Sequence, residues 1–157
     1  MLECIVLGTG PSLLDFLLEH NKESLKGITL IGCGRLVIDV DIYCYGDPRR
    51  RPDVPDVETT EVYAHQFVHE PGMIRWQEEW PHGGTAGGMA VTVACLKFDR
   101  IGLIGFDGFR TPEFEHYDNF VINFNNEILD YWQARGKKLY SLMSHSIFNE
   151  RLLKLDV

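Results

Sequence analysis

The chain has 157 residues, 45% of them hydrophobic, and a formal net charge of −8 at pH 7. This length is typical of one domain with its own core, and the acidic surface excludes general binding to nucleic acids. No apolar run approaches the ~20 residues that span a bilayer, so no membrane span is expected. The first residues, MLECIV, lack the features of a signal peptide, and we therefore expect a cytoplasmic protein.

Short apolar runs alternate with helical patterns along the chain. The predicted strands are 3–7, 28–32, 41–46, 60–67, 100–107 and 137–142. The predicted helices are 12–24, 85–98 and 119–136. The run 60–67 alternates polar and apolar residues like a half-solvated strand, and 49–60 is predicted to be an irregular loop. This alternation predicts an α/β fold, a single Rossmann-like domain over residues 1–157 with a mostly parallel central sheet and helices on both faces.

The stretch GTGPSL follows the first predicted strand and opens the first predicted helix. Gly8 and Gly10 allow close approach of a ligand to the backbone, Pro11 stiffens the entry, and Ser12 begins the helix. The amides at a helix start favour an anion, so the stretch is a candidate phosphate site. The third glycine of a dinucleotide-binding GxGxxG motif is absent, and a purely structural turn is an equally good interpretation.

The stretch HGGTAGGMA places glycines and a hydroxyl at another predicted helix start. Thr85 is expected to cap this helix and to reach a phosphate oxygen. The alternative is a tight turn that packs against the sheet. Ligands of open α/β sheets bind at the carboxyl ends of the strands, where both turns are expected. Two such turns therefore favour one shared anion site.

Three further side chains are candidates for chemistry. Asp107 follows the predicted strand 100–107 and could bind a sugar hydroxyl or a metal, or simply form a turn. Asp47 ends the predicted strand 41–46 at the same edge. His116 precedes the last predicted helix and could accept a proton from an attacking hydroxyl, although a surface histidine is the alternative. We assign no metal to the other histidines.

The cysteines and three aromatic residues are candidates for the core. The four cysteines form no CxxC pair and lie within or beside apolar segments, so small buried thiols are predicted. Phe67, Trp76 and Trp80 could form an exposed apolar patch or part of the core, and we favour the core. A homo-oligomer is compatible with the first interpretation.

Taken in order, these motifs resemble those of bacterial sialyltransferases that use CMP-sialic acid. They are also similar to related proteins of unknown function and to archaeal 6-hydroxymethylpterin diphosphokinases, which share the GxGPSL turn. The resemblance implies nucleotide contacts from Gly8, Thr9, Gly10, Pro11, Ser12, Gly34, Asp47, Thr85, Ala86, Gly87, Asp107 and Phe109. It also implies that His116 is the general base. Gly84 is assigned to the second phosphate-binding turn because it belongs to the glycine-rich stretch before the predicted helix.

The chain departs from the sialyltransferase pattern at five of these positions. Thr9, Gly34 and Asp47 replace amides, Ala86 replaces a serine, and Phe109 replaces a tyrosine. Each lost partner of a buried polar group costs roughly 1–3 kcal/mol, so CMP-sialic acid itself is expected to bind poorly.

We therefore expect a nucleotide- or nucleotide-sugar-dependent transferase that resembles glycosyltransferases. Its donor phosphates would bind between residues 8–12 and 84–87, and a sialyltransferase-like reaction would need no metal. A catalytically silent module that binds a nucleotide or a protein is the first alternative, because several polar residues are lost. A magnesium-dependent diphosphokinase is the second, with Asp47 and Asp107 holding Mg²⁺.

Overall fold

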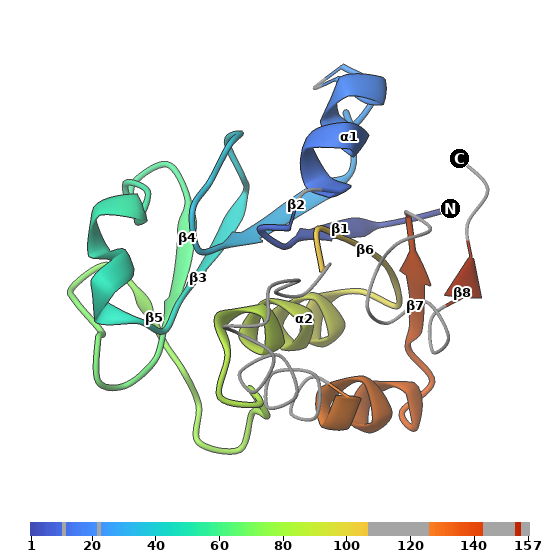
Figure 1. Ribbon diagram of the computed structural model, residues 1–157. Helices are drawn as coiled ribbons and strands as arrows, with labels where there is room; N and C mark the ends of the chain where they lie inside the picture. The colour runs from blue at the N-terminus through green and yellow to red at the C-terminus, as the bar shows by residue number, and fades with distance from the viewer. Residues whose placement is uncertain (11, 22, 107–125, 143–152, 155–157) are drawn as a thin grey trace, which may run out of the picture.

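The computed structural model describes residues 1–10, 12–21, 23–106, 126–142 and 153–154. Within these ranges, eight strands form one sheet in the order β5-β4-β3-β2-β1-β6-β7-β8 (Figure 1). Every neighbouring pair is parallel. The strands are β1 (Cys4–Leu7), β2 (Thr29–Cys33), β3 (Ile42–Tyr45), β4 (Glu61–Ala64), β5 (Ile74–Arg75), β6 (Arg100–Ile104), β7 (Lys138–Ser141) and β8 (Leu153–Lys154).

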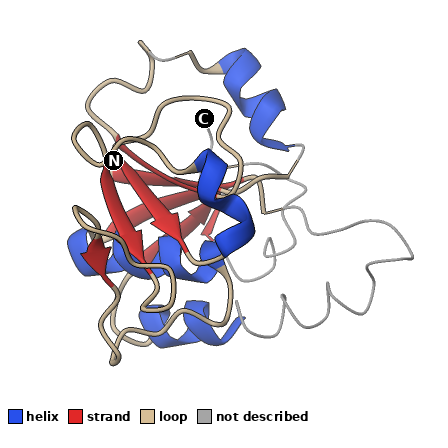
Figure 2. Cartoon of the chain, turned by 90° about the vertical axis from the view of Figure 1, so that its left-hand side faces the viewer, coloured by secondary structure: helices blue, strands red, loops and turns tan. Residues whose placement is uncertain are grey.

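Helices cover both faces of the sheet. Helix α1 (Ser12–Glu19) lies on one side, and α2 (Ala86–Lys97) lies on the other with a helical segment at 126–133. Figure 2 shows the strands as a layer with helices above and below it. A 3-10 helix, η1 (Pro48–Asp53), follows β3. The predicted Rossmann-like α/β class is therefore confirmed.

The strands read as apolar runs because both of their faces are buried. In β1, the side chains of Cys4 and Val6 belong to the core beneath α2, whereas Ile5 and Leu7 belong to the core beneath α1. Helix α1 contributes Phe16 to the core on its own side of the sheet, together with Ile5 and Leu7. Burial on both faces explains why the central strands could be located from hydropathy alone.

Three local predictions are wrong. The run 60–67 is not half-solvated, because Val62, Tyr63 and Ala64 are all buried, with Tyr63 in one core and Val62 and Ala64 in the other. The first helix ends at Glu19 instead of continuing to residue 24. The predicted loop 49–60 contains most of η1, which begins with a proline in its first turn.

The aromatic residues divide between core and surface. The side chain of Trp76 is 2% exposed and Trp80 packs against the same core, as predicted. Phe67 is 91% exposed, so its assignment to the core is wrong. Its ring stacks on His65, with the ring centroids 5.1 Å apart. The four cysteines are buried free thiols, as predicted.

The strand order reverses between β1 and β6. From β1 the chain continues through α1 to β2 on one side, whereas β6 is reached from β5 through α2 on the opposite face. In open α/β sheets this switch point, at the carboxyl ends of the strands, is where ligands bind. Both predicted Gly-rich turns lie at this edge, since one follows β1 and the other precedes α2.

Candidate functional site

The turn after β1 is joined to the end of β6 by hydrogen bonds. The N–H of Gly8 donates to the carbonyl of Ile104 and the N–H of Gly10 donates to that of Gly105, both at 2.7 Å. In return, the N–H of Gly105 donates to the Ser12 hydroxyl at 3.0 Å. A Cβ on Gly8 would lie 2.4 Å from the carbonyl oxygen of Gly105. The glycine at position 8 therefore serves contact between two backbones, and two amides of the turn have acceptors within the protein.

Two predicted site residues, Thr9 and Gly34, lie against each other. Thr9 is exposed at the tip of the turn, and Gly34 follows β2 with a positive φ of 64°. A Cβ on Gly34 would lie 2.9 Å from Cγ2 of Thr9. The carbonyl of Gly34 also accepts a hydrogen bond of 2.6 Å from the Tyr43 hydroxyl, which holds the loop against β3.

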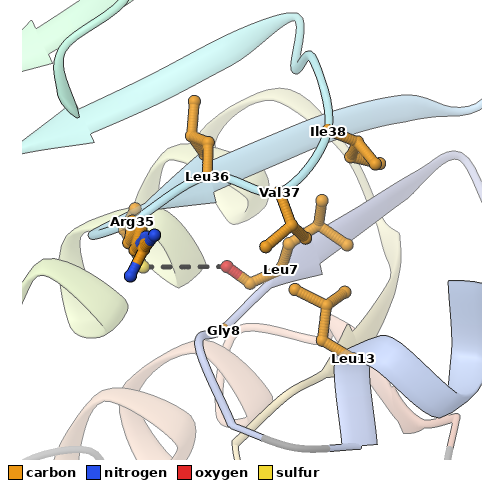
Figure 3. Close-up of a pocket in the computed structure, with 8 residues that line it drawn as sticks. Leu7, Gly8, Leu13, Arg35, Leu36, Val37 and Ile38 are labelled. Atoms are coloured by element: carbon orange, nitrogen blue, oxygen red, sulfur yellow. Dashed lines mark hydrogen bonds between the residues drawn. The ribbon is translucent and has the colours of Figure 1, made fainter.

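A small apolar pocket lies beside this contact (Figure 3). It is lined by the end of β1, by Leu13 of α1 and by residues 35–38 of the loop after β2. The space free for water is about 10 Å³, which is enough for about one water molecule. A nucleotide bound at this edge would therefore lie outside this pocket, over the exposed tip of the turn.

The start of α2 is capped as predicted. The hydroxyl of Thr85 accepts a hydrogen bond of 2.9 Å from the N–H of Gly88. Within the described part of the chain, the N–H groups of Ala86 and Gly87 have no acceptor. These two donors and the positive end of the helix dipole make the first turn of α2 suited to an anion.

The first turn of α2 contacts the ends of two strands. A Cβ on Gly87 would lie 3.1 Å from the ring of Phe106. Phe106 is the residue that follows Gly105, which contacts Gly8. Gly46, after β3, lies against Met89, because a Cβ there would be 2.9 Å from the sulfur. The two Gly-rich turns are thus brought to one edge, with the segment 105–106 in contact with both.

Asp47 lies at the same edge but is engaged locally. Its carboxylate accepts hydrogen bonds from the N–H of Arg49 at 2.9 Å and from the guanidinium Nη2 at 2.8 Å, and it caps η1. The hydrogen bonds from Arg49 hold the pKa of Asp47 below its usual value. Among the described residues, no group of three or more His, Cys, Asp or Glu side chains could hold a metal ion.

Two histidines that were not predicted as site residues lie against each other, and one of them, His82, lies just before α2. His65 follows β4 and His82 precedes the cap of α2, with their rings edge to face and the centroids 5.4 Å apart. Nδ1 of His82 accepts a hydrogen bond of 2.9 Å from the N–H of Gly84. Burial and then the proximity of His65 lower the pKa of His82. The signal was present in HGGTAGGMA, where His82 directly precedes the two glycines.

Four of the predicted site residues lie outside the described residues. They are Pro11, Asp107, Phe109 and His116. Their proposed roles in phosphate binding, sugar binding and proton transfer stay predictions.

The fold and this edge define a Rossmann-like α/β domain with an anion-suited helix start at the switch point of its sheet. Comparisons of the chain with protein-family models, with curated proteins and with solved structures found no match. Over the described ranges, no helix combines the length and the apolar character needed to cross a membrane.

Proposed function

We propose that this protein is a nucleotide- or nucleotide-sugar-dependent transferase whose donor phosphate binds the first turn of α2. The observation that carries the proposal is the pair of N–H groups on Ala86 and Gly87, which have no acceptor among the described residues. They belong to a 12-residue helix that begins at the switch point of a parallel sheet. The resemblance to nucleotide-dependent transferases through the GxGPSL and TAG stretches supports the same ligand class.

The reaction would transfer a group from the donor phosphate to an acceptor hydroxyl. The amides of α2 would stabilise the charge that develops on the departing phosphate, as preorganised dipoles do. His116 is predicted to take the proton of the attacking hydroxyl, and Asp107 to bind a sugar hydroxyl. Thr9, exposed beside Gly34, would contact the nucleotide from the opposite side of the edge.

A catalytically silent binding module is the second candidate. It is favoured by the pairing of Gly8 and Gly10 with backbone carbonyls of residues 104 and 105, because a turn used in this way needs no ligand. The diphosphokinase alternative has less support, since the carboxylate of Asp47 is already bonded to Arg49. It still predicts a response to Mg²⁺.

A thermal-shift screen tests the proposal. The melting temperature would be measured with CMP, CDP, UDP, GDP, ADP, ATP and several nucleotide sugars, each with and without Mg²⁺. A ligand at ~100 times its dissociation constant adds about 2.7 kcal/mol of stability, which a melt detects. A shift with one nucleotide class and without metal supports the transferase. A shift only with Mg²⁺ supports the kinase, and no shift with any ligand contradicts nucleotide binding.

A cytoplasmic location belongs to the same proposal. Its support is the state of the four cysteines, which are all free thiols in the structure. Disulfides are rare in reducing compartments, where such thiols persist.

A further inference from the structure

His82 holds the loop that leads into α2 through its ring and its backbone. Nδ1 accepts the hydrogen bond of 2.9 Å from Gly84, and the carbonyl oxygen accepts one of 3.3 Å from the N–H of Thr85. Between these bonds, Gly83 and Gly84 have positive φ values of 63° and 73°. A side chain is disfavoured at both positions, so this left-handed turn depends on glycine and on its hydrogen bonds.

The turn is packed directly against the first turn of α2. A Cβ on Gly88 would lie 2.1 Å from the carbonyl oxygen of His82, so the two backbones touch. The N–H of Gly88 is the same group that Thr85 caps. The conformation of residues 82–85 therefore determines how the cap and the N–H groups of Ala86 and Gly87 are placed.

The hydrogen bond from Gly84 exists only when the imidazole of His82 is neutral. The N–H of Gly84 can donate a hydrogen bond to Nδ1 only when Nδ1 carries no proton, so the neutral tautomer has its proton on Nε2. Protonation would place an N–H on Nδ1, facing the N–H of Gly84. The bond would then be replaced by a repulsive contact between two donors.

The surroundings of His82 favour the neutral form. The ring of His65, after β4, lies edge to face with it, and the ring of Trp76, after β5, lies 6.3 Å away between centroids. Among the described residues, His65 is the titratable group whose charge acts on His82, and α2 carries no charged side chain before Lys97. Burial and the charge of His65 both lower the pKa of His82.

We infer that His82 is a positioning residue, which holds the first turn of α2 in its anion-binding conformation while the imidazole is neutral and releases it on protonation. The inference about the turn stands on the hydrogen bonds of His82. Its consequence for a bound phosphate rests on the proposed function.

The first arm of the test needs no ligand. Nitrogen-15 spectra of the imidazole rings, recorded across a pH titration, give the tautomer and the pKa of His82. We expect the Nε2–H tautomer, a pKa below the ordinary value of about 6.5, and loss of hydrogen-exchange protection at the Gly84 amide at the same midpoint. A Nδ1–H tautomer, or protection at Gly84 that does not follow the titration of His82, overturns the inference.

The second arm uses CMP as the probe at about pH 7.5 and about pH 5. His82→Asn retains an acceptor that can bond the amide two residues on, but it does not titrate; His82→Leu removes the acceptor. We expect His82→Leu to bind CMP about ten-fold more weakly than the wild type at the higher pH, and His82→Asn to restore most of that loss. In acid, CMP affinity should fall more in the wild type than in His82→Asn, which corrects for protonation of the phosphate itself.

Failure of the inference and failure of the proposed function give different results. If the wild type binds CMP and neither substitution changes its affinity or its pH dependence, the inference about His82 is wrong and nucleotide binding stands. If the wild type binds no CMP at either pH, CMP is excluded as the nucleotide of the proposed function. The tautomer and the exchange of Gly84 then decide the inference alone.

Discussion

Gly8 and Gly105 approach so closely that a Cβ on Gly8 would lie 2.4 Å from the carbonyl oxygen of Gly105. This contact joins the ends of β1 and β6, the two strands between which the strand order reverses. The atoms in contact belong to backbone, which cannot move aside like the end of a flexible side chain. The first glycine of the GTGPSL stretch is therefore required by the sheet itself, whatever the ligand.

Replacing Gly8 by alanine should destabilise the fold. The added methyl must displace the backbone of residue 105, and overpacking of this kind costs typically 1–3 kcal/mol. Urea unfolding of the variant and the wild type measures the difference. Thr9→Ala is the matched control, because Thr9 is exposed and its substitution should change stability by about 0.5 kcal/mol or less. Equal losses in the two variants would show that the contact is not specific to position 8.

Replacing His65 by phenylalanine should raise the pKa of His82. The aromatic ring is kept against His82 and Phe67, but the charge that lowers the pKa of His82 is removed. Because the folded-state pKa of His82 is depressed, its neutral form contributes stability above the unfolded value, and that stability is lost as the pH falls through the folded value. The variant should lose less stability between pH about 7 and pH about 5 than the wild type. The ring titration by NMR and urea unfolding at the two pH values measure this. An unchanged or lower pKa of His82 would contradict the role of His65.

Replacing His116 by alanine should separate chemistry from binding. If His116 is the general base, turnover with the donor found in the screen should fall by about 10²- to 10⁴-fold. The dissociation constant of the nucleotide should change little, since the phosphate is expected on α2. Steady-state rates and a binding titration on the same preparation test this pair of expectations. Activity equal to that of the wild type would remove His116 from the mechanism.

The sequence predicted the strands of the sheet centre well and the edge strands poorly. The runs that became β1, β2, β3 and β6 are apolar because both sheet faces are covered, so hydropathy located them within one to three residues. Strands β5 and β8 have two residues each, which is too short for any periodicity to show. The 3-10 helix η1 was hidden because its prolines and arginines read as a loop.

The location of the candidate site was predicted more reliably than the contacts that form it. Thr85 was correctly identified as a cap, because a hydroxyl before a small-residue helix is a local signal. The role of Gly8 could not be read in the same way, since its partner is 97 positions away, at Gly105. His82 precedes two glycines in the sequence, but its hydrogen bond with Gly84 depends on the left-handed turn that residues 83 and 84 form in the fold, and it was therefore missed.

The proposed function depends most on the N–H groups of Ala86 and Gly87, for which the described residues offer no acceptor, and Ala86→Pro tests them directly. Proline at the first helical position removes one N–H, and its fixed φ suits a helix start; Thr85 before it is already in the extended conformation that proline prefers. Ala86→Ser is the control, because it retains the N–H. Both variants should melt close to the wild type.

The measurement is the dissociation constant of the nucleotide that gives the largest thermal shift, determined by titration calorimetry for the wild type and both variants. Loss of a hydrogen bond to a charged phosphate costs about 1.5–3 kcal/mol, so Ala86→Pro should bind roughly ten- to a hundred-fold more weakly, and Ala86→Ser should bind like the wild type. Equal affinity of all three proteins, with the fold intact, would contradict phosphate binding at the first turn of α2.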